Sequence, residues 1–177
     1  LCFLLIKTII LKIKQVVMMN IQTIKEGKEY LRNNFKKGVT CPCCNQFVKL
    51  YKRKLNQSMA YALTIMYKLH TVKGFDRYLK MNEEIAKLKI PSSNIEYPKL
   101  AYFKLIEEVP KPMTKDDKKN TGLWRLSKMG IDFVKGQIEV PAYALIYNGT
   151  CYGFSDEKTN IIKALGTKFN YNELMSN

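Results

Sequence analysis

The sequence has few acidic residues, a single histidine and no apolar run long enough to cross a membrane. Its 15 Asp and Glu residues stand against 30 Lys and Arg residues. The most apolar stretch, at residues 1–17, is interrupted by Lys7, Lys12 and Lys14, whereas a membrane-spanning helix needs about 20 apolar residues in a row. No small-residue cleavage site follows this stretch, so it is not an ordinary signal peptide. We therefore expect no membrane partner.

Regular patterning begins only after Met18 and Met19. We expect residues 1–18 to be a non-native extension, either translated upstream sequence or an over-called start, with an amphipathic leader helix as the alternative. The hydrophobic share of the whole chain, 46%, is ordinary for a globular protein, so a folded core is expected.

Catalytic motifs are missing as well. The sequence contains no Gly-rich phosphate loop, no nucleophile elbow and no metalloprotease motif. Its acidic residues are scattered over helix starts and surface pairs. We expect that the chain is not an enzyme.

Five cysteines occur, and three of them lie in the segment 41–44, which reads Cys-Pro-Cys-Cys. An odd number without regular spacing argues against a secreted disulfide framework. It favours a reducing compartment, so we expect a cytoplasmic protein.

Cys41 and Cys44 have the Cys-x-x-Cys spacing with which a tight turn aims two thiolates at one zinc ion. A structural zinc needs four ligands, and the remaining sources are Cys43, His70, Cys151 or a second subunit. Reduced thiols in a tight turn are the alternative. A thioredoxin-type redox role is disfavoured because no βαβ pattern surrounds the motif.

Positive charge gathers between residues 25 and 54. This segment holds nine Lys and Arg and two Glu, an excess of seven within a net charge of +15. Such an imbalance usually signals a polyanionic partner, and a generally cationic surface is the alternative. The segment ends in a basic run of Lys49, Lys52, Arg53 and Lys54. We expect this run to contact phosphates; otherwise it is a solvated loop face.

The central part of the sequence presents its elements in the order of a winged helix. A capping box of Thr23 and Glu26 first predicts a helix that stops near Gly38. The elements expected after it are a core helix at 56–69, a strand at 77–81, a helix at 83–88 capped by Asn82, a helix from Pro98, an exposed wing at 109–122, a strand at 123–126 and a helix at 128–135.

A second hairpin is predicted near the C-terminus. Strands at 143–147 and 150–154 flank Asn148-Gly149, the strongest signal for a type I′ turn, and a short helix ends near Leu165. The fold class is therefore α+β. A winged helix-turn-helix core at 56–136 is preceded by the helix, cysteine turn and basic run of 19–55. It is followed by the hairpin and short helix of 137–177.

Two resemblances support this organisation. Winged-helix regulators carry a signature in which an aromatic strand leads to Leu, Ser or Thr, two variable residues and Gly, and it is similar to Leu123-Trp-Arg-Leu-Ser-Lys-Met-Gly-Ile-Asp-Phe133. A second resemblance, to an uncharacterised family of small proteins encoded by bacteriophages and prophages, covers Thr23 to Met175. It rests on the cysteine turn with its basic run, Val140-Pro-Ala-Tyr, Ile146-Tyr-Asn-Gly, Gly153-Phe-Ser and Ala164-Leu-Gly-Thr-Lys-Phe. It implies a phage setting and no particular activity.

We expect the protein to bind nucleic acid, with double-stranded DNA as the first candidate and a role in transcription or replication. Beyond the basic run, the residues expected to face the nucleic acid are Ser92, Ser93, Asn94, Lys99 and Tyr102 in the helix-turn-helix and Lys115, Lys118 and Lys119 in the wing. Pro98 shortens the second helix of this motif, so phosphate contacts should outweigh base reading. The alternatives left open are a protein-protein adaptor and an RNA binder whose hairpin stacks bases on Tyr147 and Tyr152. A homodimer is also left open.

Overall fold

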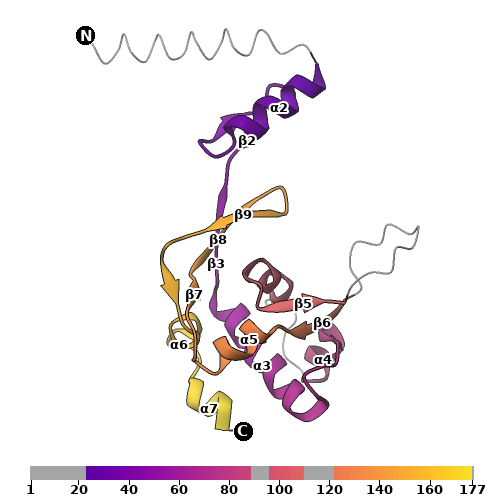
Figure 1. The fold of residues 1–177 in the computed structure, drawn as a ribbon, viewed down its shortest axis with the longest axis vertical. Coiled ribbons are helices and arrows are strands. Elements are labelled where there is room, and N and C mark those ends of the chain that lie inside the picture. The colour runs from indigo at the N-terminus through magenta and orange to yellow at the C-terminus, as the bar shows by residue number, and fades with distance from the viewer. Residues whose placement is uncertain (1–22, 89–95, 110–121, 177) are drawn as a thin grey trace. The chain divides into compact units, whose positions relative to one another are not determined.

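In the computed structural model of the chain, residues 23–88, 96–109 and 122–176 are described (Figure 1). They belong to two compact units, residues 1–51 and residues 52–177. The fold is of the mixed α+β class, with several helices and small antiparallel sheets. Over the described residues, every helix is too short or too polar to cross a membrane.

The first unit contains α2 (Ile24–Asn34), whose start is fixed by a capping box. The Thr23 hydroxyl accepts a hydrogen bond from the N–H of Glu26 at 3.2 Å, and the Glu26 carboxylate accepts from the N–H of Thr23 at 2.9 Å. The predicted helix start is confirmed. Beyond α2, the strands β1 (Val39–Thr40) and β2 (Phe47–Val48) pair antiparallel, and the cysteine turn connects them.

The second unit is built around α3 (Gln57–Lys73), which begins after Asn56. The Asn56 side chain accepts from the N–H of Met59 at 3.0 Å, as an N-cap residue should. In the described residues α3 is followed, in order, by β4 (Leu79–Lys80), α4 (Met81–Lys87), η2 (Tyr97–Phe103), β5 (Ile106–Glu108), β6 (Leu123–Leu126) and α5 (Lys128–Val134). Strands β4, β5 and β6 form an antiparallel sheet, and β6, the last of the three along the chain, lies between the other two.

The cap predicted for α4 was wrong. Helix α4 begins at Met81, so Asn82 lies inside it, and Lys80 occupies the N-cap position without a side-chain hydrogen bond. The Asn82 side chain instead accepts a hydrogen bond from the Tyr97 hydroxyl at 3.0 Å. A contact between two distant segments thus uses the side chain that the local pattern assigned to a cap.

The segment that begins near Pro98 forms a 3-10 helix, η2, where the sequence predicts an ordinary two-turn helix. Pro98 lies in its first turn, where a missing N–H is tolerated. Leu100 and Phe103 are buried, as expected for the inward face. The helix ends at Lys104, which is left-handed with a φ of 58°. Such tight helices usually occur only in short pieces.

The C-terminal hairpin is confirmed. Strands β8 (Tyr143–Tyr147) and β9 (Thr150–Phe154) pair antiparallel, and Asn148 and Gly149 have φ values of 47° and 72°. Two positive φ values are what a type I′ turn requires. The segment Tyr51–Lys54, which contains three basic residues, forms β3, a strand that the sequence pattern did not predict. Strand β3 joins this hairpin in the order β3-β8-β9.

The remaining elements close the second unit. They are β7 (Val140–Pro141), which pairs with β10 (Lys158–Thr159), and the helices α6 (Ile161–Leu165) and α7 (Tyr171–Ser176). The Tyr171 hydroxyl donates to the carbonyl of Val134 at 2.8 Å and so fastens α7 to the end of α5.

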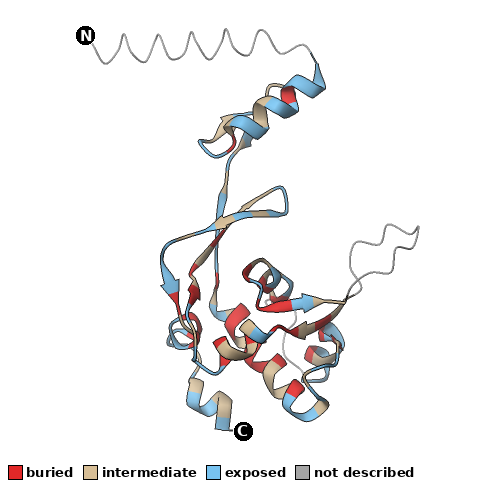
Figure 2. Cartoon of the chain, in the orientation of Figure 1, coloured by how far each residue is buried: buried red, intermediate tan, exposed pale blue. Residues whose placement is uncertain are grey.

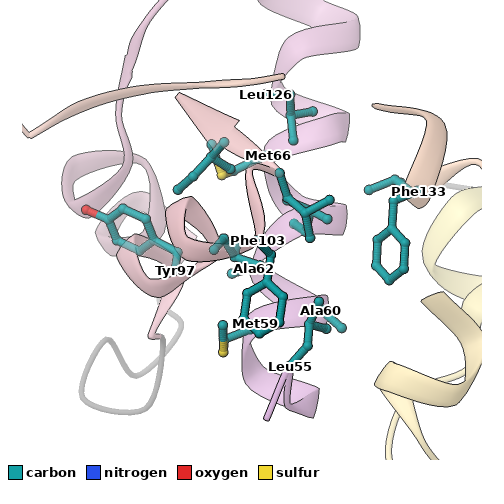
Figure 3. Packing of buried hydrophobic residues seen from close by; sticks show 14 of the residues in the cluster. Leu55, Met59, Ala60, Ala62, Met66, Tyr97, Phe103, Leu126 and Phe133 are labelled. Atoms are coloured by element: carbon teal, nitrogen blue, oxygen red, sulfur yellow. The ribbon is translucent and has the colours of Figure 1, made fainter. Parts of the chain in front are cut away.

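The hydrophobic core of the second unit lies around α3. Figure 2 shows that buried positions gather on this helix and on the segments around it. Met59, Ala62 and Met66 are fully buried in α3, and they pack in one cluster with residues of η2, β6 and α5, such as Phe103 and Phe133 (Figure 3). Because α3 is covered on several sides, its apolar residues are not confined to one stripe.

Candidate nucleic-acid interface and cysteine turn

Strand β3 places the basic run of the second unit on the surface. All of its residues, Tyr51–Lys54, are exposed, and β3 is an outer strand of the sheet β3-β8-β9. Successive side chains of a strand point to opposite faces, so Arg53 lies on the face opposite to Lys52 and Lys54. Among the described residues no carboxylate forms a salt bridge with these three side chains.

Exposed lysines on an outer strand also have a purely structural use. They prevent another sheet from pairing with the free strand edge. On β3 three cations follow one another, and none of them forms a salt bridge with a described carboxylate. Such a run is also able to bind a polyanion.

Arg53 lies close to a second set of polar residues at the start of η2. The Glu96 carboxylate forms an ion pair with Lys99 and accepts a hydrogen bond from the Asn56 side chain at 3.2 Å. The hydrogen bond from Lys99 is the main cause that lowers the pKa of Glu96, and the charge of Arg53 adds to this effect. The N-cap of α3 and the first turn of η2 therefore meet at Glu96.

The residues predicted on the helix-turn-helix are only partly described. Lys99 lies on η2 and is engaged by Glu96, and Tyr102 is half-buried. Ser92, Ser93 and Asn94, together with Lys115, Lys118 and Lys119 of the expected wing, lie outside the described residues. Of the predicted nucleic-acid-binding residues in the second unit, those that are both described and exposed are therefore Lys52, Arg53 and Lys54 of β3. The contact between Asn56 and Glu96 joins segments far apart in the chain, so no local pattern signals it.

Lys49 belongs to the first unit and is exposed. Its ammonium group lies 6.0 Å from the ring centroid of Phe47 and 5.6 Å from that of Tyr51. These are the distances of weak, solvent-exposed cation–π contacts. They hold the Lys49 side chain over aromatic surface and leave its charge accessible.

The cysteine turn is held by backbone hydrogen bonds between β1 and β2. The N–H of Cys41 donates to the carbonyl of Gln46 at 2.8 Å, and the N–H of Asn45 donates to the carbonyl of Cys41 at 2.9 Å. Asn45 is left-handed with a φ of 59°, a conformation that Asn adopts more readily than most residues. The turn leaves Cys41 buried and Cys44 exposed, and both thiols are reduced.

The Cys41 sulfur is the acceptor at the centre of this turn. The backbone N–H groups of Cys43 and Cys44 donate to it and lower the pKa of the Cys41 thiol, and the thiols of the same two residues strengthen the effect. Hydrogen bonds of this kind favour the thiolate, which is the form that binds metal. Cys41 and Cys44 therefore lie in one tight turn at the Cys-x-x-Cys spacing of zinc ligands.

The described residues supply no complete metal site, because no group of three or more His, Cys, Asp and Glu side chains is arranged to hold an ion. His70, one of the predicted additions, is fully buried and uses both ring nitrogens inside the core. Cys151 lies in β9, where its thiol donates to the carbonyl of Gly153 at 3.4 Å. Of the predicted ligands, only Cys41 and Cys44 combine the spacing of a zinc pair with a position in one turn.

The exposed face of β9 carries aromatic side chains. Tyr152 is 50% exposed and Phe154 is 37% exposed, because alternate residues of the strand point outward. The Tyr152 ring lies 6.1 Å from that of Tyr147 across the hairpin. Tyr147 and Tyr152 are the residues predicted to stack bases, and Phe154 adds a further exposed ring.

Comparison of the chain with protein-family models, with curated proteins and with solved structures found no match.

Proposed function

We propose that this protein binds nucleic acid, with double-stranded DNA as the preferred ligand, and that it does so mainly through phosphate contacts. The observation that carries the proposal is β3, in which Lys52, Arg53 and Lys54 are exposed and free of salt bridges to any described carboxylate. Each lysine or arginine that neutralises a phosphate releases condensed counterions, which favours binding at low salt.

The proposal includes a winged helix-turn-helix as the scaffold. The order α3, β4, α4, η2, β5, β6 supports it, since a winged helix has three helices, with one strand after the first and two strands after the third. The sheet order β4-β6-β5 supports it as well, because the last strand of a winged helix pairs with both earlier ones. Helix α5 then corresponds to the helix that follows the wing. The resemblance to phage proteins implies a phage setting, and the role that we propose there is in transcription or replication.

Base-specific reading is expected to be weak. In a helix-turn-helix, the second helix enters the major groove and presents several side chains to the bases. Here that position is held by η2, a short 3-10 helix whose Lys99 is paired with Glu96. Phosphate contacts fix position and carry no direct sequence information, so different duplexes should bind with similar affinity.

A second candidate is binding of single-stranded RNA, and the exposed face of β9 favours it. Tyr152 and Phe154 offer ring surface on which unpaired bases can stack. In that case the basic strand β3 would contact phosphates, and the aromatic strand β9 of the same sheet would contact bases. Duplex DNA hides the faces of its bases, so the two candidates predict opposite preferences.

Fluorescence anisotropy separates them. Labelled duplex DNA, single-stranded RNA of equal length and heparin are each titrated with the full chain at several salt concentrations. We expect the duplex to bind more tightly than heparin and RNA at matched salt. Tighter binding of RNA than of duplex would favour the second candidate, and equal affinity for duplex and heparin would reject the DNA proposal.

A further inference from the structure

The turn between β1 and β2 presents half of a metal site on the surface of the first unit. Its geometry is fixed by the backbone bonds from Cys41 to Gln46 and from Asn45 to Cys41. The hairpin register, Thr40 opposite Phe47, brings the two strand ends together directly at the turn. Two reduced cysteines at Cys-x-x-Cys spacing therefore lie in a hydrogen-bonded hairpin turn.

The missing half has no source in the described residues. Tetrahedral structural zinc takes four ligands, and Cys41 and Cys44 supply two. His70 is committed to the core, the Cys151 thiol is bonded within β9, and no group of three or more ligands occurs over the described ranges. Cys43 lies in the same turn, but the Cys-x-x-Cys spacing typical of zinc ligands is that of Cys41 and Cys44.

We propose that two copies of this chain share one zinc ion, and that each copy contributes the thiolates of Cys41 and Cys44. A twofold axis through the ion makes the two halves identical, as in most homodimers. The exposed position of Cys44 leaves room for the approach of a second turn. This inference concerns the first unit and does not depend on the proposed function.

Charge supports a tetrathiolate site here. Zinc with four thiolates has a net charge of −2, and the described part of the first unit, residues 23–51, carries six Lys and Arg against two Glu. Lys36 and Lys37 are exposed shortly before the turn. Two such basic surfaces repel each other in the absence of an ion, so the anionic zinc centre would reduce the repulsion that opposes dimerisation.

The first test is the stoichiometry of the full chain without nucleic acid. The protein is purified without chelator, zinc is measured by elemental analysis, and mass is measured by light scattering before and after removal of zinc with EDTA. We expect one zinc ion for two chains, a dimer with zinc and a monomer without it. One zinc ion in a monomer, a dimer that survives complete removal of zinc, or the absence of zinc after addition of one equivalent would overturn the proposal.

Variants in the turn test the ligand assignment. C44S should lose zinc and become monomeric, whereas C43S, the matched control in the same turn, should keep both. Equal loss in C43S and C44S would overturn the assignment. Because C44S could alter folding, cobalt is also added to the metal-free wild-type chain. We expect thiolate-to-cobalt charge-transfer absorption to rise until one cobalt is present for two chains, with the intensity of four thiolates; saturation with the intensity of two would overturn the proposal.

Discussion

His70 accepts a hydrogen bond at Nε2 from the backbone N–H of Leu126, 3.3 Å away, and so joins the last turn of α3 to β6. Its other ring nitrogen, Nδ1, lies 2.9 Å from the carbonyl oxygen of Gly74. Both contacts are satisfied when Nδ1 carries the proton and Nε2 is the acceptor, which is a neutral ring. The only histidine of the chain is therefore a buried bridge in the core, stacked near Phe75 at 5.8 Å.

Replacement of this histidine should destabilise the second unit strongly. In H70A the buried N–H of Leu126 loses its acceptor and a cavity remains, so we expect the free energy of unfolding to fall by about 3 kcal/mol. Urea denaturation followed by circular dichroism measures the loss. V72A is the matched control, because Val72 lies on the same helix and is 85% exposed; its change should stay within about 0.5 kcal/mol. Similar losses in both variants would contradict the bridge.

Stability should also fall on mild acidification. Burial lowers the pKa of His70 below its ordinary value of 6.5, so the native state keeps the ring neutral while the unfolded chain takes up a proton. The neutral ring of His70 makes its full contribution to the free energy of unfolding above pH 6.5, the ordinary pKa of histidine. It decreases as the pH falls from there toward the lower pKa of the folded state, by at most about 1.4 kcal/mol per pH unit.

Urea midpoints between pH 5 and 8 test this dependence against H70Q, which cannot titrate. The wild-type chain should lose stability over this range, and the variant should lose much less. Hydrogen bonds from lysines lower the pKa values of Glu84 and Glu96, so these carboxylates add a small loss of stability at the acid end of the range. Both proteins contain them, so the comparison of slopes removes this loss. Equal slopes for the two proteins would contradict the neutral, buried state of His70.

The segment Leu126–Gly130 shows why part of this fold could be predicted from sequence. Ser127 caps α5 by accepting from the N–H of Gly130 at 2.9 Å, and its hydroxyl donates to the carbonyl of Lys104 at 2.6 Å. One serine thus ends a strand, starts a helix and holds the neighbouring segment. An N-cap residue must stand directly before the first residue of its helix, so the start of α5 could be predicted from the local sequence. The type I′ turn at Asn148-Gly149 was predictable for the same local reason.

The rest depends on contacts between distant segments. Nothing in the local sequence of Tyr51–Lys54 favours a strand, and β3 forms because β8 offers it a partner. In the same way, the Glu96 carboxylate is placed by Asn56, which lies forty residues earlier. The basic run could therefore be named from the sequence, while its position beside the start of η2 could not. The cysteine turn could also be located from the sequence, whereas the hydrogen bonds that hold it could not.

Gly130 tests the close packing of α5 on the segment before β5. A Cβ at this position would lie 2.0 Å from the carbonyl oxygen of Leu105, so backbone atoms must move in G130A. We expect a loss of about 3 kcal/mol in the free energy of unfolding, measured by urea denaturation. At an open helical position the same change would raise the free energy of unfolding by about 0.5–1 kcal/mol. A gain in stability would therefore contradict the close packing of Gly130. K128A, an exposed change in the same helix, should be nearly neutral.

The basic strand makes the sharpest prediction for binding. Simultaneous replacement of Lys52, Arg53 and Lys54 by Ala removes three cations, each of which is expected to contact one phosphate. A plot of log affinity for duplex DNA against log salt concentration should then become flatter by about two to three units, because each contact contributes about 0.9 to the slope. Anisotropy titrations at four or more salt concentrations give this slope.

A control with the same loss of charge separates contact from general attraction. The same unit has three other exposed lysines: Lys135 at the C-terminal end of α5, Lys158 in β10 and Lys163 in α6. Their triple replacement by Ala lowers the net charge equally, but it should leave the slope nearly unchanged, since counterion release follows the phosphates that are contacted. Equal flattening in both triple variants would mean that β3 is only part of a cationic surface. An unchanged slope in the β3 variant would remove that strand from the interface.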